Sequence, residues 1–133
     1  MNSKREFQSA REMMEKNIVF IDALATAKEA VDTMRREKVE FLIVKKRNDQ
    51  DAYGIVAIRD LIRGVIIPER TSEEVHVFEI MRKPLITVPS TMDVRHVARL
   101  LIRTDLRMAP VEENGEYIGI ISLSRIILKN VLF

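Results

Sequence analysis

An eight-residue pattern occurs twice in the chain and constrains its fold more than any other feature. Tyr53–Asp60 reads YGIVAIRD, and Ile118–Arg125 reads IGIISLSR. Each copy places a glycine before a short apolar strand, then a turn with polar residues, then a second apolar segment. Internal repetition of this kind indicates that the chain is built from copies of one supersecondary unit.

The repetition extends over most of the chain. Met13–Phe20 aligns with Met81–Val88, and the apolar strand Phe41–Val44 aligns with Met108–Val111. Each copy predicts the order strand, helix, strand, hairpin, strand, helix. Two copies are too few for a solenoid, in which stacked neighbours cover one another's apolar faces. We therefore expect the two copies to pair face to face.

Local signals predict element boundaries in the first copy. Residues 1–17 carry apolar side chains spaced for one helical face, which predicts an N-terminal helix. Thr26–Glu29 has the form of a capping box and is expected to start the next helix. A further helix should begin at Asp60 and end at Gly64 and Pro68.

The second copy carries matching signals. Val75, Phe78 and Met81 are spaced for a short helix ahead of its first strand. Asn114–Gly115 is a strong signal for a tight hairpin turn. Ser124 is a candidate cap for the last helix, because serine is favoured at that position.

Composition argues against several classes of function. The chain has 133 residues without cysteine, so it has no disulfide framework and no thiolate chemistry. It shows no signal peptide and no apolar run near the roughly 20 residues of a membrane span, and we expect a cytoplasmic protein without membrane contact. Neither histidine has metal-ligand neighbours, and no base accompanies a nucleophile. We therefore predict no catalytic residues, no metal and no catalytic cofactor.

The repeated pattern resembles the signature of the CBS domain, which is named for cystathionine β-synthase. That signature runs glycine, hydrophobic, any residue, Thr or Ser, two further residues, then Asp. The first copy keeps Asp60 but has Ala57 in place of the hydroxyl, whereas the second keeps Ser122 but has Arg125 in place of the aspartate. Ala109–Val111 also resembles the Leu-Pro-Val strand of this family.

The resemblance implies a tandem CBS pair, or Bateman module, with an α+β fold. Each repeat would be a small three-stranded sheet with two helices in the order β-α-β-β-α. The implied organisation is an N-terminal helical extension over 1–12, a first CBS domain over 13–67, a linker over 68–74 and a second CBS domain over 75–133.

CBS pairs commonly bind adenosine-containing ligands (AMP, ADP, ATP or S-adenosylmethionine) in two clefts between the repeats, and they act as regulatory sensors. The signature aspartate accepts hydrogen bonds from both ribose hydroxyls, as an ionised carboxylate can. Carried over to this chain, the ligand-binding residues would be Ala57, Arg59, Asp60, Thr87, Leu106, Arg107 and Met108. The second cleft would have Val19, Val39, Glu40, Ser122, Ser124 and Arg125.

The two implied sites differ in chemistry. The first has a ribose acceptor and arginines suited to phosphate. The second has Arg125 where the acceptor belongs, and an Arg125–Glu40 pair would close it to a nucleotide. We therefore predict one adenosine ligand per chain, held through Asp60.

Other interpretations stay open. The resemblance also implies a homodimer that signals to a regulated protein, which the sequence does not identify. The broken motifs at Ala57 and Arg125 favour an alternative, a structural dimerisation module with decayed nucleotide sites. A nucleic-acid partner is supported only by a row of arginines on one helix and a pI near 9.0, against a net charge of only +2. Asp60 could also be a plain helix N-cap.

Overall fold

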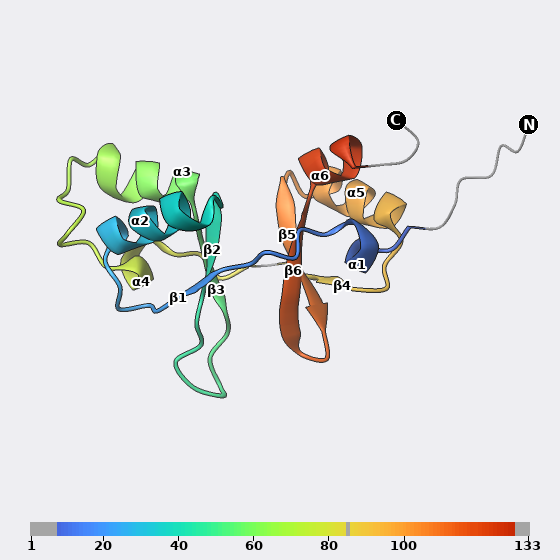
Figure 1. The fold of residues 1–133 in the computed structure, drawn as a ribbon, viewed down its shortest axis with the longest axis horizontal. Coiled ribbons are helices and arrows are strands. Elements are labelled where there is room, and N and C mark those ends of the chain that lie inside the picture. Colours follow the sequence, from blue (N-terminus) through green and yellow to red (C-terminus); the bar gives the residue numbers. More distant parts are fainter. Residues whose placement is uncertain (1–7, 85, 130–133) are drawn as a thin grey trace, which may run out of the picture. The chain divides into compact units, whose positions relative to one another are not determined.

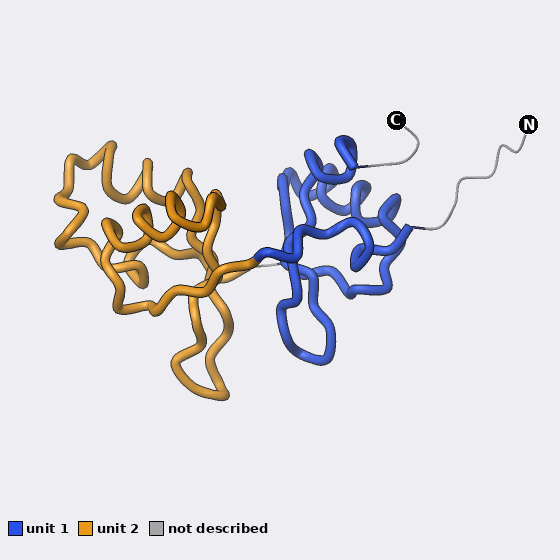
Figure 2. Tube along the Cα trace, viewed as in Figure 1, with its two compact units in different colours: residues 1–17, 85–133 blue, residues 18–84 orange. Residues whose placement is uncertain are grey.

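The computed structural model describes residues 8–84 and 86–129, which divide into two units with separate cores. Unit 2 contains residues 18–84, and unit 1 combines residues before 18 with residues after 84 (Figure 2). Each unit has one three-stranded sheet with its own helices (Figure 1). The predicted α+β fold with two β-α-β-β-α repeats is therefore confirmed.

Unit 2 is built around the sheet order β1-β2-β3. Its elements are β1 (Phe20–Ile21), α2 (Ala27–Glu37), β2 (Phe41–Val44), β3 (Gly54–Ala57), α3 (Ile58–Leu61), the π-helix η1 (Ile62–Ile66) and α4 (Val77–Ile80). Strand β1 runs parallel to β2, and β2 is antiparallel to β3 with Leu42 opposite Val56. Both of these side chains are fully buried, so this register places the apolar centre of the sheet in the core.

Unit 1 repeats this topology with the sheet order β4-β5-β6. Its elements are α1 (Ala10–Met13), β4 (Val88–Pro89), α5 (Val94–Arg103), β5 (Met108–Glu113), β6 (Glu116–Ser122) and α6 (Leu123–Leu128). The predicted hairpin turn is confirmed, because Asn114 and Gly115 have φ angles of 55° and 81°. Two successive positive φ angles match the twist of the flanking strands.

The segment before the first strand of each repeat does not pack where the predicted domain boundaries would place it. Ala10 and Met13 are buried in the core of unit 1, although residues 1–12 were expected to extend outside both repeats. Val75 and Val77 are fully buried in the core of unit 2, although the second domain was expected to begin at residue 75. Each leading segment therefore supplies apolar side chains to the unit that holds the other repeat.

Three local predictions need correction. Helix α1 spans only Ala10–Met13 within the described part of the predicted N-terminal helix, and residues 1–7 lie outside that part. Gly64 does not end a helix but lies inside η1, where a Cβ atom would collide with the side chain of Ile80. The cap of α6 is Ser122, not Ser124, because the chain is still extended at Ser122 and turns into the helix directly after it.

Candidate functional site

The first signature turn connects β3 to α3 and places Asp60 in the third position of that helix. Ala57 is the N-cap residue, and its side chain offers no acceptor. The Asp60 carboxylate folds back instead, so that the backbone N–H of Ala57 donates to Oδ2 at 2.8 Å. Asp60 is therefore not the N-cap itself but the acidic half of a capping box that lacks its hydroxyl half.

Arg82 covers the same carboxylate from the segment that follows α4. Its Nε donates to Oδ1 of Asp60 at 2.7 Å, and its Nη2 donates to Oδ2 at 3.1 Å. The Asp60 side chain is 5% exposed and that of Arg82 is 47% exposed. Bidentate arginine–carboxylate pairs of this kind are among the stronger polar contacts in proteins. Both oxygens of the predicted ribose acceptor are thus engaged within unit 2.

The backbone fixes Arg82 at this position. Its N–H donates to the carbonyl of Ile55 at 2.8 Å, and its carbonyl accepts from the N–H of Ile55 at 2.7 Å. The neighbouring Lys83 donates to the carbonyl of Ala52 at 2.6 Å and to the Asp51 carboxylate at 3.2 Å. The segment is therefore attached to β3 and to the loop before it.

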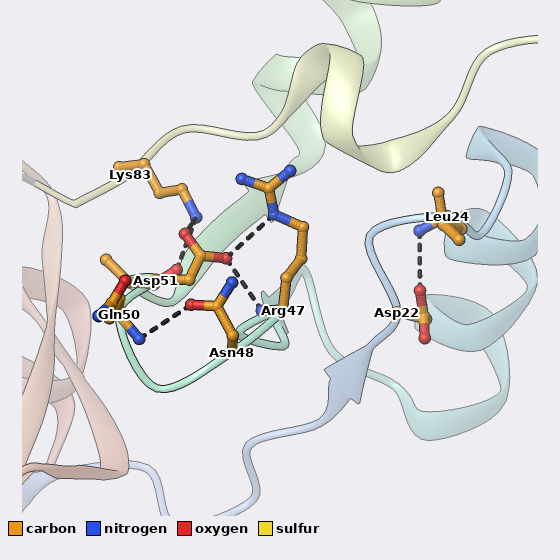
Figure 3. Close-up of polar contacts among 8 residues, drawn as sticks. Asp22, Leu24, Arg47, Asn48, Gln50, Asp51 and Lys83 are labelled. Carbon is orange, nitrogen blue, oxygen red and sulfur yellow. Dashed lines mark hydrogen bonds and ion pairs between the residues drawn. The ribbon is translucent and has the colours of Figure 1, made fainter.

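Asp51 joins this segment to the hairpin loop, as Figure 3 shows. Its carboxylate accepts from the backbone N–H of Arg47 at 3.0 Å and lies between the side chains of Arg47 and Lys83. The Arg47 N–H, followed by the Lys83 ammonium, holds the pKa of Asp51 far below its usual range. The carboxylate is therefore ionised at neutral and mildly acidic pH, where it can pair with both cations.

The second signature turn, from β6 to α6, has the complementary half of the box. The Oγ of Ser122 accepts from the backbone N–H of Arg125 at 3.0 Å. The Arg125 side chain donates to the carbonyl of Met13 at 3.1 Å and contacts the Glu15 carboxylate at 3.4 Å. Arg125 therefore has an acidic partner within unit 1.

Each unit has an ion pair at the equivalent place, but the acidic and the basic residue are interchanged between the units. Glu15 exchanges backbone hydrogen bonds with Ile120 in unit 1, as Arg82 does with Ile55 in unit 2. Glu15 thus corresponds to Arg82, and Arg125 corresponds to Asp60. In this alignment Met14 matches Met81, one residue away from the match of Met13 with Met81 that the sequence suggested.

The other predicted site residues divide between the units. In unit 2, Arg59 and Glu40 are exposed, and Val19 and Val39 are half-buried. In unit 1, Arg107 and Ser124 are exposed, whereas the half-buried residues are Thr87, Leu106, Met108, Ser122 and Arg125. The strand register places Met108 opposite Ser122, and the N–H of Leu123 donates to the carbonyl of Arg107. Arg107 and Met108 thus lie beside the second signature turn.

Sequence reasoning missed Arg82 and Glu15, although a signal for them exists. Once Met14 is aligned with Met81, the next residues are Glu15 and Arg82, and the turns they contact carry Arg125 and Asp60. Both matched positions therefore change the sign of their charge between the repeats, and such a paired change indicates that the two residues contact each other.

Among residues 8–84 and 86–129, no three acidic or histidine side chains are grouped to hold a metal ion, and no helix is long and apolar enough to cross a membrane.

Comparison with known proteins identifies the family. The family model of the CBS domain, which describes the sequences of that family, matches residues 10–67 and 77–130 of this chain. The structure of the hexameric CBS-CP12 protein from bloom-forming cyanobacteria superposes with a TM-score of 0.86 and 38% identity, covering 94% of this chain and 72% of that one.

Two curated relatives are similar in sequence. The uncharacterized protein MK0525 of Methanopyrus kandleri is 28% identical over 90% of this chain and 61% of its own length. The mitochondrial CBS domain-containing protein CBSX3 of Arabidopsis thaliana is 31% identical over 77% of this chain and 51% of its own length. The chain thus spans less than two thirds of either relative. Because the family model matches both repeats across most of its residues, the chain belongs to the CBS domain family.

Proposed function

We propose that this tandem CBS chain is a non-catalytic regulatory module that binds one adenosine-containing ligand through Asp60 and signals to a partner protein. The observation that supports it is a single carboxylate at the signature turn, 5% exposed, whose two oxygens accept hydrogen bonds from Ala57 and Arg82. A ribose presents two adjacent hydroxyl donors, and an ionised carboxylate can accept from both. The equivalent position in the other repeat is Arg125, which cannot accept a hydrogen bond, so we propose one ligand per chain.

The family resemblance implies six further ligand-binding residues, and the role of each can be tested by measuring ligand affinity after its substitution. These residues are Ala57, Arg59, Thr87, Leu106, Arg107 and Met108.

Calorimetric titration with AMP, ADP, ATP and S-adenosylmethionine tests the proposal. We expect one site per chain, and we expect Asp60→Asn to weaken binding at least about 10-fold, since a hydrogen bond to a charged group contributes about 1.5–3 kcal/mol. The matched control is Asp32→Asn, which removes a carboxylate of the same unit that pairs with Lys28 on the surface of α2. Absence of binding by all four ligands, two equal sites, or an unaltered affinity in Asp60→Asn would overturn the proposal.

A second candidate function, homodimerisation, is favoured by apolar side chains exposed along one helical face. Ile58, Ile62 and Ile66 are spaced four residues apart along α3 and η1 and are 46%, 43% and 62% exposed. Side chains at this spacing form a continuous stripe, and its burial against a second copy would remove it from water. Light scattering should then give twice the chain mass of 15.4 kDa.

The double variant Ile62→Glu/Ile66→Glu should return the mass to that of one chain, because carboxylates resist burial without partners. Leu24→Glu is the control, since Leu24 is 71% exposed but lies outside this helix. A wild-type protein that runs as a monomer at micromolar concentration would exclude the dimer.

A further inference from the structure

The acceptor proposed for ribose is already occupied in the structure. Both oxygens of Asp60 accept from the Arg82 guanidinium, and Oδ2 also accepts from the N–H of Ala57. A ribose diol needs these same two oxygens. Binding at Asp60 therefore requires the Arg82 side chain to move away.

Only the side chain of Arg82 has to move. Its backbone is bonded to Ile55 in both directions, and Lys83 is bonded to Asp51 and Ala52. The side chain is 47% exposed, so it has solvent-accessible space to turn into while its Cα stays in place. A displaced guanidinium would thus remain close to whatever occupies Asp60.

The chemistry of the ligand decides what Arg82 gains when it moves. A neutral nucleoside offers the guanidinium no anion in exchange for the lost carboxylate. A phosphate group presents oxygens that accept the same forked pair of donors as a carboxylate. Unlike adenosine, its phosphates can therefore replace the contact that their ribose removes.

We propose that Arg82 masks Asp60 in the free protein and makes the site selective for adenosine phosphates over adenosine. This inference rests on the proposed binding at Asp60 and adds the class of ligand. It concerns unit 2 alone, because in unit 1 the charges are reversed and Arg125 stands where the acceptor would be.

The test measures the affinity of ADP and of adenosine by calorimetry in wild type and in Arg82→Gln. Loss of the guanidinium unmasks Asp60 for both ligands but removes the phosphate contact from ADP alone. We expect the preference for ADP over adenosine to fall at least about 10-fold, the equivalent of one charge-assisted hydrogen bond. Arg82→Lys should fall between the two proteins, because it keeps the charge and loses the fork.

Arg70→Gln is the matched control, since it removes another arginine of unit 2 that pairs with a carboxylate, Glu79, at 2.8 Å. Its preference for ADP should equal that of wild type. Circular dichroism confirms that each variant is folded, and if Arg82→Gln does not fold, the comparison is made with Arg82→Lys. A preference for ADP that is unchanged in the folded Arg82 variant would overturn the inference while leaving binding at Asp60 intact.

The two proposals fail in different ways. If wild type binds no adenosine ligand but Arg82→Gln binds adenosine, the masking role stands and the proposed function of the wild-type site falls. If neither protein binds any of them, both proposals are overturned. If adenosine binds wild type as tightly as ADP does, the selectivity assigned to Arg82 is wrong.

Discussion

Completing the capping box of the first repeat should stabilise the protein. The variant Ala57→Ser adds the hydroxyl that the turn lacks, at a residue whose φ and ψ are −127° and 175°. Ser122 occupies the same position in the second repeat with −131° and 160°, and its Oγ accepts from the backbone N–H of Arg125. A serine at position 57 therefore needs no change of backbone to accept from the N–H of Asp60.

The expected gain follows from what N-caps contribute elsewhere. Replacement of a serine cap by alanine costs about 1 kcal/mol, so the reverse change should add about 1 kcal/mol to the free energy of unfolding. Ala57 is 7% exposed, and a buried hydroxyl without a partner would instead lower stability by about 1–3 kcal/mol. The sign of the effect thus reports directly whether the cap hydrogen bond forms.

Urea unfolding followed by circular dichroism measures the effect as a shift of the midpoint at constant slope. Ser122→Ala is the reciprocal variant and should lose about 1 kcal/mol. The melting temperature should move by roughly 4 °C in opposite directions in the two proteins. If Ala57→Ser is neutral or destabilising while Ser122→Ala loses stability, the equivalence of the two turns is refuted.

Two further predictions concern packing and pH. Gly119→Ala should lower the free energy of unfolding in urea by about 1–3 kcal/mol, which is more than Gly54→Ala should. The reason is that a Cβ at position 119 would lie 2.8 Å from the backbone oxygen of Glu15, whereas a Cβ at position 54 would lie 3.4 Å from the nearest backbone oxygen. The N–H of His76, followed by the Arg70 guanidinium, lowers the pKa of Glu79 to about 2 from an ordinary 4.5. Its contribution to stability is present above pH 4.5 and lost as pH falls towards 2, so acid titration of Glu79→Gln should show a flatter stability profile across that window.

Much of the fold could be predicted because its signals are local and occur twice. The buried strands Phe41–Val44 and Gly54–Ala57 read as apolar runs, and Asn114–Gly115 specifies its own turn. The packing of the leading segments could not be predicted from local signals. Ala10 and Val77 lie on short apolar stripes that fit either core, and only long-range contacts decide which core each one enters.

The arrangement around Asp60 could be predicted only in part. The family pattern led to Asp60 because the pattern is contiguous in sequence. It did not lead to Arg82, which reaches Asp60 across 22 residues and only because its backbone is bonded to Ile55. The one-residue shift that placed Met13 over Met81 also concealed the charge reversal, because two consecutive methionines fit the apolar pattern equally well.

The charge reversal explains how two nearly equivalent segments find different partners. Each leading segment offers the same reciprocal backbone bonds and a methionine that packs against a signature glycine, so neither feature distinguishes one turn from the other. If the segments exchanged places, Glu15 would face Asp60 and Arg82 would face Arg125. Like charges about 4 Å apart repel by about 1–4 kcal/mol near a protein surface, whereas the observed pairs attract. Charge repulsion therefore disfavours the exchanged arrangement and favours the observed docking of each segment.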